Sequence, residues 1–404
     1  MKRLGNIFLG KMLQGEPKTS ADVAAPYLRA AHVQPQGRLI DVDAKTMWFS
    51  EQELELHDLR ADDVVIVEGG AGYGRSAVVP EDRPGWGFQN SIIRVRPRCG
   101  IATGRFLNYA LQAALTAGEI EVVCYTATIP HFTADKVGAF LVPAPPLHTQ
   151  LAIADHLDRE TARIDTLIKE QQRLIEMLRE RRDAAWAVAV DQAYQSGREM
   201  DVRRVITSIV DGPFGSSLTS EHYSDEGARV IRLGNIGINE FRDADEAFIP
   251  LEYADELGAH EVKRNDVVVA GLGDDKMPLG RAAVVPDIGR AIVKADCYRL
   301  RPNRLVSSEY LAWVMSAPQT RSQIMLLARG ATRSRLNTKV VQQVKIPVPD
   351  RDEQDALVAQ SVAETLKVDA LIAETERFIE LARERRSALL TAAVTGQIDI
   401  REVA

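Results

Sequence analysis

The 404-residue sequence contains only three cysteines, and none of them lies in a C-x-x-C spacing. Neither a disulfide framework nor an ordinary zinc site is therefore expected. No apolar run approaches the ~20 residues that a membrane-spanning helix needs. The amino terminus has too short an apolar stretch for a signal peptide. These absences predict a soluble cytoplasmic protein.

Motifs of common catalytic sites are also missing, since H-E-x-x-H, G-x-S-x-G and paired Cys/His clusters do not occur. One stretch, Gly69–Ser76, approaches the phosphate-binding pattern G-x-x-x-x-G-K-[ST], but Arg75 stands where the lysine should be. The continuation "SAVVP" is β-branched and ends at proline, which predicts a strand rather than the required helix. A nucleotide hydrolase that uses this stretch is one alternative, and a simple hairpin is the favoured interpretation.

The net charge of −7 is unexpected for a protein that binds nucleic acid. Most of the acidic excess lies in residues 151–200 and 350–404, which carry −2 and −5. Residues 1–150 and 201–349 carry −1 and +1. The charge distribution therefore leaves room for a local basic surface on the two nearly neutral regions.

An internal repeat decides the predicted fold. "TARIDTLIKEQQRLIEMLRERRDAAWAVAV" from Thr161 matches "TLKVDALIAETERFIELARERRSALLTAAV" from Thr365, at an offset of 204 residues. "FLVPAPPLHTQ" and "VKIPVPDRDEQ", which end at Gln150 and Gln354, share that offset. "GRSAVVP" from Gly74 likewise matches "GRAAVVP" from Gly280. The predicted order is therefore globular region, long helix, globular region, long helix.

Each predicted long helix carries an apolar stripe at three- and four-residue spacing. The stripes comprise Ile164, Leu167, Ile168, Leu174, Ile175 and Leu178 in the first copy, and Val368, Leu371, Ile372, Phe378, Ile379 and Ala382 in the second. Roughly 45 residues give a rod about 65–70 Å long, and its natural partner is the other copy. Connectivity then requires an antiparallel pair with pseudo-two-fold symmetry. A coiled-coil scaffold without DNA function is an alternative interpretation.

The globular regions are rich in short strand-like runs, with two plausible helices, "GRFLNYALQAAL" and "SSEYLAWVMSAP". The strand-like runs are "DVVIVE", "SAVVP", "SIIRVRP" and "EVVCYTAT" in the first region, and "RVIRLGNI", "DVVVAG", "AAVVP" and "CYRLRP" in the second. The predicted class is α+β, with two mixed α/β regions joined by two long antiparallel coiled-coil helices. The glycine–arginine pairs are expected in hairpins with long tips.

Polar loops before the long helices, "CYTATIPHFTADK" and "LARGATRSRLNTK", are suited to DNA, because arginine neutralises phosphates and reads guanine. Amides such as Gln89 and Asn90, which align with Lys294 and Ala295, are candidates for adenine contacts. For any single residue a solvated charged loop is the competing interpretation. The candidate DNA-binding residues are Arg75, Gln89, Asn90, Arg94, His131, Arg281, Lys294, Arg329, Arg333, Arg335 and Lys339.

The sequence resembles the specificity subunits of type I restriction–modification systems along its whole length. The resemblance rests on "DGPFGSSL", "VIRLGNIG", "IPVPDRDEQ" and "ARERRSALLTAAVTGQIDI", and on "AFLVPAPPLHTQLAIADHLDRETARIDTLI" in the first half. It implies target-recognition domains at 1–146 and 198–349, a spacer helix at 147–197, and a second spacer helix with a C-terminal tail at 350–404.

The resemblance further implies a non-catalytic chain that reads a bipartite, asymmetric site on double-stranded DNA. The expected partners are two methyltransferase (modification) subunits and motor-nuclease (restriction) subunits. S-adenosylmethionine, ATP and Mg²⁺ would belong to those partners, and this chain would hold no cofactor or metal. Parts alike in both copies should serve identical partners. The candidate partner-binding residues are therefore Arg179, Arg181, Arg182, Arg383, Arg385 and Arg386.

Overall fold

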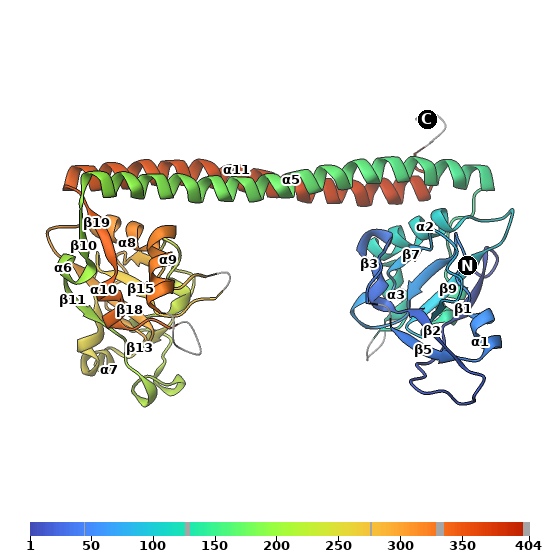
Figure 1. Cartoon of the computed structure of the whole chain (residues 1–404), viewed down its shortest axis with the longest axis horizontal. Helices are drawn as coiled ribbons and strands as arrows, with labels where there is room; N and C mark the ends of the chain where they lie inside the picture. Colours follow the sequence, from blue (N-terminus) through green and yellow to red (C-terminus); the bar gives the residue numbers. More distant parts are fainter. Residues whose placement is uncertain (44, 126–129, 275–276, 329–334, 399–404) are drawn as a thin grey trace. The chain divides into compact units, whose positions relative to one another are not determined.

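The computed structural model describes residues 1–43, 45–125, 130–274, 277–328 and 335–398. Contacts divide the chain into two compact units. Unit 1 comprises Met1–Gln172 with Glu376–Ala404, and unit 2 comprises Arg173–Thr375. Each unit contains one globular region and a part of both long helices (Figure 1). Because the units divide both helices, the domain boundaries named above stay predictions.

Unit 1 is built on a four-stranded antiparallel sheet of order β1-β9-β6-β7. A smaller sheet has the order β5-β2-β8, in which β2 and β8 run parallel. The strands are β1 (Gly5–Leu9), β2 (Val23–Leu28), β3 (Val33–Gln34), β4 (Arg38–Leu39), β5 (Thr46–Phe49), β6 (Val64–Val67), β7 (Ser76–Val78), β8 (Gly87–Phe88) and β9 (Ile92–Pro97). The short helices are α1 (Glu51–Leu56), α2 (Gly104–Thr116), α3 (Glu119–Cys124) and α4 (Ala134–Ala139). Val64 and Ile66 of β6 meet the apolar residues of α2 in one core, and Val65 and Val67 on the opposite face of the strand belong to another.

Unit 2 repeats this topology, because its main sheet has the order β11-β18-β15-β16. Its second sheet has the order β13-β12-β17-β14, and here β12 and β17 are the parallel pair. The strands are β10 (Arg198–Asp201), β11 (Ile206–Val210), β12 (Ala228–Ile231), β13 (Phe248–Ile249), β14 (Glu261–Val262), β15 (Val267–Ala270), β16 (Ala282–Val284), β17 (Ala291–Val293), β18 (Cys297–Pro302) and β19 (Lys345–Val348). The helices are α6 (Val202–Val205), α7 (Leu251–Glu256), α8 (Ser308–Ser316), α9 (Pro318–Leu327) and α10 (Thr338–Gln343). The predicted internal repeat is confirmed.

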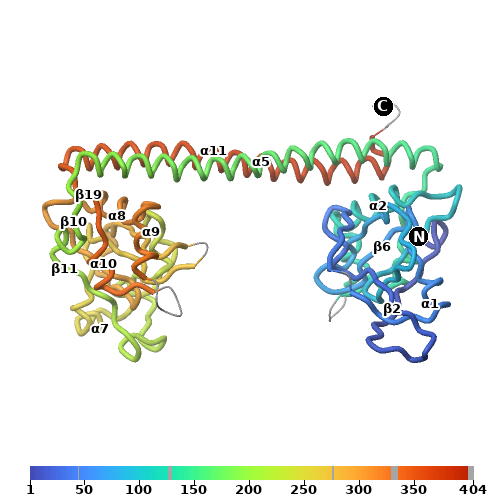
Figure 2. Tube along the Cα trace, viewed as in Figure 1, coloured from blue at the N-terminus to red at the C-terminus, as the bar shows by residue number. Residues whose placement is uncertain are grey.

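The two long helices are α5 (Leu147–Ser196) and α11 (Arg351–Val394), and Figure 2 lets the reader follow the chain into and out of each. In unit 1, Ile153 and Leu157 share a core with Leu390, Ala393 and Val394. The side chain of Arg386 in unit 1 binds Asp165 at 3.1 Å. Contacts of early α5 with late α11 confirm the antiparallel pairing.

Unit 2 contains the equivalent ion pair, in which Arg182 binds Asp369 at 2.7 Å. Both partners of this pair lie 204 residues from their counterparts Arg386 and Asp165. The buried contact between the two helices is narrower than the predicted apolar stripe, because two residues of that stripe, Leu371 and Phe378, are exposed. A pair of helices covers only a narrow stripe of each.

A buried glutamine fastens each globular region to its long helix. In unit 1 the Nε2 of Gln150 donates to the carbonyl oxygens of Ile101 and Pro145, at 2.9 and 2.8 Å. Its Oε1 accepts from the backbone N–H of Thr103 at 3.2 Å.

Gln354 repeats all three bonds in unit 2. It donates to Leu305 and Pro349, both at 2.8 Å, and accepts from the backbone N–H of Ser307 at 3.0 Å. Asp350 caps the start of α11, since its Oδ1 accepts from the N–H of Glu353 at 3.0 Å.

One strand prediction is wrong, because the beginning of "EVVCYTAT" forms the end of α3. Gly118, with φ 76°, turns the chain into this helix. Ile120 and Cys124, four residues apart, then face the core, whereas Val122 points to solvent. β-branched residues favour strands only where a sheet offers a place for them. Residues 126–129 lie outside the described residues.

Candidate nucleic-acid interface

The stretch that resembles a phosphate loop is a hairpin. Strands β6 and β7 pair antiparallel around a short 3₁₀ turn, and no helix follows Ser76. Gly74 has φ 76°, a conformation that favours glycine. Its N–H donates to Val67 O at 2.9 Å. The predicted hairpin is confirmed, and the cradle of a nucleotide site is missing from Gly69–Ser76.

Unit 2 repeats this hairpin turn with β15 and β16. Gly280 has φ 79°, and its N–H donates to Ala270 O at 3.0 Å. The arginine after each glycine also binds the first strand of its hairpin. The carbonyl of Arg75 accepts from the N–H of Val67, and the carbonyl of Arg281 accepts from the N–H of Ala270. The Gly–Arg backbone is therefore a shared structural device.

A second shared contact brings the loop after β1 or β11 against the loop before β9 or β18. A Cβ on Gly10 would lie 2.0 Å from Gln89 O, and one on Gly212 would lie 2.0 Å from Lys294 C. Only glycine permits this approach of two backbones. The N–H of Ile92 and that of Cys297 then bind the carbonyls of Gln89 and Lys294 at 2.8 and 3.0 Å.

A third shared contact adds the segment before α4 or α10. Isolated β-bridges join Gly69 to His131 and Leu272 to Arg335. The N–H of the next residue, Phe132 or Leu336, donates to the hairpin at 2.7 or 2.9 Å. The hairpin also binds the loop before β9 or β18. The N–H of Glu68 donates to Ser91 O at 3.0 Å, and that of Gly271 donates to Asp296 O at 2.7 Å. Three loops thus meet in the same way in both units.

This shared backbone presents different side chains. We call the unit 1 set frame 1, which comprises Met12, Gln89, Ser91 and His131. The unit 2 set is frame 2, which comprises Phe214, Lys294, Asp296 and Arg335. Met12 and Phe214, each two residues after the close-packed glycine, are 75% and 50% exposed. The two frames therefore offer one backbone with two chemical surfaces.

Frame 2 is cationic and aromatic. The Nε of Arg335 donates to Asp296 Oδ1 at 2.7 Å, and its guanidinium lies 5.5 Å from the Phe214 ring centroid. The Nζ of Lys294 donates to Tyr223 OH at 3.0 Å and lies 5.3 Å from that ring centroid. Such groups bind phosphates, guanine and base faces.

A half-buried carboxylate, that of Asp211, supports the backbone of frame 2. Asp211 Oδ1 accepts from the N–H of Asp296 at 3.0 Å and from that of Gly212 at 2.7 Å. Burial raises the pKa of Asp211, and the two N–H donors act in the opposite direction.

Frame 1 contains no lysine, arginine or acidic residue, and it presents an amide, a hydroxyl, an imidazole and a thioether. His131 is exposed, and its carbonyl accepts from Lys136 Nζ at 3.0 Å. Gln89 is half-buried, and Asn90 beside it donates its N–H to Lys11 O at 2.8 Å. These groups can form hydrogen bonds to base edges.

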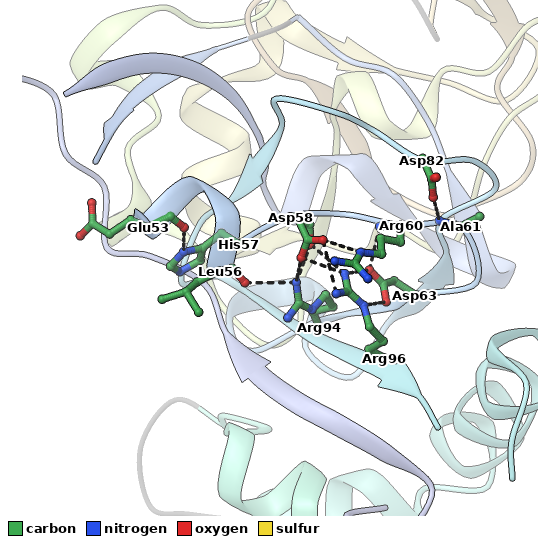
Figure 3. A network of polar contacts seen from close by, with 10 residues as sticks. All are labelled: Glu53, Leu56, His57, Asp58, Arg60, Ala61, Asp63, Asp82, Arg94 and Arg96. Atoms are coloured by element: carbon green, nitrogen blue, oxygen red, sulfur yellow. Dashed lines mark hydrogen bonds and ion pairs between the residues drawn. The ribbon is translucent and has the colours of Figure 1, made fainter. Parts of the chain in front are cut away.

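The structure removes Arg94 from the candidate DNA contacts. Its guanidinium is buried, where it binds Asp58 Oδ1 at 2.9 Å and Leu56 O at 3.2 Å (Figure 3). Burial lowers the pKa of Arg94. Arg96, two residues further along the same face of the strand, makes a bidentate pair with Asp63 at 2.8 and 2.7 Å. This network holds the sheet together and leaves Arg94 inaccessible.

Arg281 is likewise buried, and its guanidinium donates to backbone carbonyls of the neighbouring loops. The acceptors are Ile236 at 2.6 Å, Leu272 at 2.9 Å, Leu233 at 3.0 Å, Pro278 at 3.2 Å and Met277 at 3.3 Å. Burial lowers its pKa. The expectation that Arg281 contacts DNA is therefore wrong, because its donors are used inside unit 2.

The remaining candidates are accessible to different degrees. Arg75 is half-buried over Gly72, and Lys339 is exposed on α10. Arg329 and Arg333 lie outside the described residues. The frames unite Gln89 with His131 and Lys294 with Arg335. Met12, Ser91, Phe214 and Asp296 were missed, although the repeated glycine before Met12 and Phe214 could have marked two of them.

The arginines of the long helices divide into two groups. Arg182 and Arg386 bind aspartates within the helix pair, so we no longer assign them to a partner. The exposed group comprises Arg179, Arg181, Arg383 and Arg385.

Across the described ranges, no helix is long and apolar enough to cross a membrane. In that same part of the chain, no three or more histidine, cysteine or acidic side chains are placed to hold a metal ion.

Comparison with known proteins finds that the chain is similar to specificity subunits of type I restriction enzymes. The StySPI type I restriction enzyme specificity subunit of Salmonella potsdam is 24% identical over 194 residues, which cover 48% of this chain and 42% of that protein. The MjaVIII specificity subunit of Methanocaldococcus jannaschii is 20% identical over 338 residues, covering 78% and 75%. The chain thus spans less than half the length of the Salmonella relative. No family model matches the sequence.

Solved structures share the fold. A chain from work on complex assembly and conformational transition of a type I R-M system has a TM-score of 0.71 at 15% identity, covering 97% of this chain and 96% of that chain. The HsdS subunit of Thermoanaerobacter tengcongensis has a TM-score of 0.56 at 16% identity, covering 98% and 96%.

Proposed function

We propose, on the premise that this chain is a homologue of the specificity subunits of type I restriction enzymes, that it selects the DNA sequence on which such an enzyme acts. The chain is not itself the catalyst in this proposal. It reads a bipartite site on double-stranded DNA and brings the partner subunits to it.

The observation that carries the proposal is the pair of frames. Their backbone contacts are the same, from the close-packed glycines to the bridges at His131 and Arg335. Their side chains differ in charge, size and hydrogen-bonding groups. A reader of two unlike half-sites needs this combination, because the backbone places side chains at base edges and the side chains choose among them.

The long helices support the same function through their likeness. Arg179 and Arg383 are both exposed and lie 204 residues apart, and Arg181 and Arg385 repeat that relation. We propose that these two positions in each helix contact one modification subunit, so that two identical partners bind one chain. S-adenosylmethionine would enter with the modification subunits, and ATP and Mg²⁺ with the motor-nuclease subunits.

The test is the methylated sequence in living cells. The chain is produced together with a modification subunit from the same genome, in a host without adenine methylation of its own. Long-read sequencing then maps N⁶-methyladenine. We expect one bipartite motif with unlike half-sites and an unread gap. Methylation without a motif, or no methylation although the purified complex assembles, would contradict the proposal.

Binding in solution gives a second measurement. The purified complex should bind a duplex that carries the motif at least 10³-fold more tightly than a scrambled duplex, a ratio typical of specific binding. Affinity for both duplexes should fall as salt rises, since bound phosphates release counterions. Equal affinity for both duplexes would reject sequence recognition. The alternative nucleotide hydrolase predicts ATP turnover by the isolated chain that Arg75→Ala abolishes.

A further inference from the structure

We propose that Arg335 selects a guanine of a G·C pair in the half-site read by unit 2, with Asp296 as the residue that positions it. This inference rests on the proposed function and adds the base and the side chain to it. Arginine suits guanine because its two N–H groups match the O6 and N7 acceptors in the major groove.

The position of Arg335 fits this role. Its side chain is 49% exposed, and its backbone bridges to Leu272 in the hairpin. Only its Nε is engaged by Asp296, at 2.7 Å. That bond and the Phe214 ring, 5.5 Å from the guanidinium carbon, restrict the side chain through its Nε and one face of its guanidinium. A guanidinium held in this way loses less conformational entropy when it docks on a base.

Asp296 is itself fixed by its backbone. Its φ of 65° lies in the left-handed region, which costs a non-glycine residue energy. The surroundings maintain it, because its N–H binds Asp211 at 3.0 Å and its carbonyl accepts from Gly271 at 2.7 Å. The side chain of Asp296 is only 16% exposed, so few water molecules compete with Arg335 for its carboxylate.

Neighbouring cations suit the phosphate backbone better. Lys294 is a point charge held against Tyr223 at 3.0 Å. Lys339 is exposed on α10, and none of the hydrogen bonds described above orients it. Lysine lacks the planar pair of donors that reads guanine at two points. In frame 1 the position of Arg335 is taken by His131, and that of Asp296 by Ser91. The unit 1 half-site should therefore not use this device.

The experiment starts from the motif of the wild-type complex. Each base pair of both half-sites is exchanged in turn in synthetic duplexes, and affinities are measured for wild type, Arg335→Lys, Arg335→Ala, Asp296→Ala and Arg304→Ala. Arg304 is an exposed arginine of unit 2 outside frame 2, so its variant is the matched control for charge.

For Arg335→Lys we expect discrimination to fall about 10- to 100-fold at one G·C pair of one half-site, and to stay unchanged at every other position. Arg335→Ala should lose the same discrimination and weaken binding further. Asp296→Ala should reduce discrimination at that same pair only. Arg304→Ala should match the wild type at all pairs.

The other half-site serves as the internal check on folding, because unit 1 keeps its frame in every variant. The inference is overturned if Arg335→Lys preserves discrimination at all positions, or if both Arg335 variants weaken binding equally for every duplex, as loss of a phosphate contact would. A wild-type complex without any motif would instead refute the proposed function, before the variants are compared.

Discussion

Replacing Gln354 by alanine should destabilise unit 2 strongly. The side chain is fully buried and makes three hydrogen bonds, to Leu305, Pro349 and the N–H of Ser307, at 2.8–3.0 Å. Alanine leaves two carbonyls and one N–H without this partner, and each orphaned buried group costs about 1–3 kcal/mol. Because carbonyls tolerate the loss better and water can enter, we expect a total of about 3–5 kcal/mol.

Gln150→Ala is the matched variant, since Gln150 makes the same three bonds in unit 1. The free energy of unfolding is measured by urea titration, with tryptophan fluorescence as the signal. Trp186 and Trp313 stack in unit 2, with ring centroids 6.3 Å apart, and report on that unit when Trp48 and Trp86 are replaced by phenylalanine. A loss below about 1 kcal/mol for Gln354→Ala would refute the assigned role of the three bonds.

Three other predictions concern arginine, glycine and histidine. Arg281→Ala should lower the free energy of unfolding by about 3 kcal/mol or more, because five loop carbonyls lose their donor. Arg75 is only half-buried, so Arg75→Ala should lower it by under about 1 kcal/mol. Equal losses for the two variants in urea titrations would contradict this prediction. Gly280→Ala should lower the free energy of unfolding by about 1–3 kcal/mol, because φ is 79° and the new Cβ would lie 2.5 Å from the Ile324 side chain. An unchanged melting temperature would contradict this and show that the turn relaxes. Burial lowers the pKa of His57, so its contribution to stability is present above the unfolded pKa of about 6.5 and is lost as pH falls toward the folded pKa. His57→Gln should flatten the pH dependence of unfolding below about pH 6.5, and an unaltered slope would exclude His57 as its source.

The repeat predicted most of the architecture. A long amphipathic helix needs a partner, and chain connectivity left the antiparallel arrangement for α5 and α11. The strand "DVVVAG" and the Gly–Arg turn were predictable because three buried valines in a row and a left-handed glycine are local signals. The failure at α3 has a tertiary cause, because its exposed Val122 carries the same local preference as a buried valine.

Site residues were harder to predict, because burial is decided by what covers a strand. Arg94 and Arg96 lie on the same face of β9, and only the structure shows that Phe8 and Phe88 enclose Arg94, with ring centroids 5.5 and 5.4 Å from its guanidinium. Its counterpart in the repeat, Arg299, is buried as well. The recurrence of "R-x-R" in both copies was therefore a signal of structure rather than of DNA contact.

The close approach at Gly10 and Gly212 has a consequence for how such a chain can diversify. Ser91 and Asp296 are each bound to the hairpin through their own backbone carbonyls, and those two bonds do not depend on which side chains the positions carry. Inherited substitutions there can alter chemical preference while the polypeptide path stays the same. Mutation of either glycine would instead displace the path itself, because no side chain fits the contact. Positions 91 and 296 can thus vary, whereas the glycines at 10 and 212 that shape the same contact cannot.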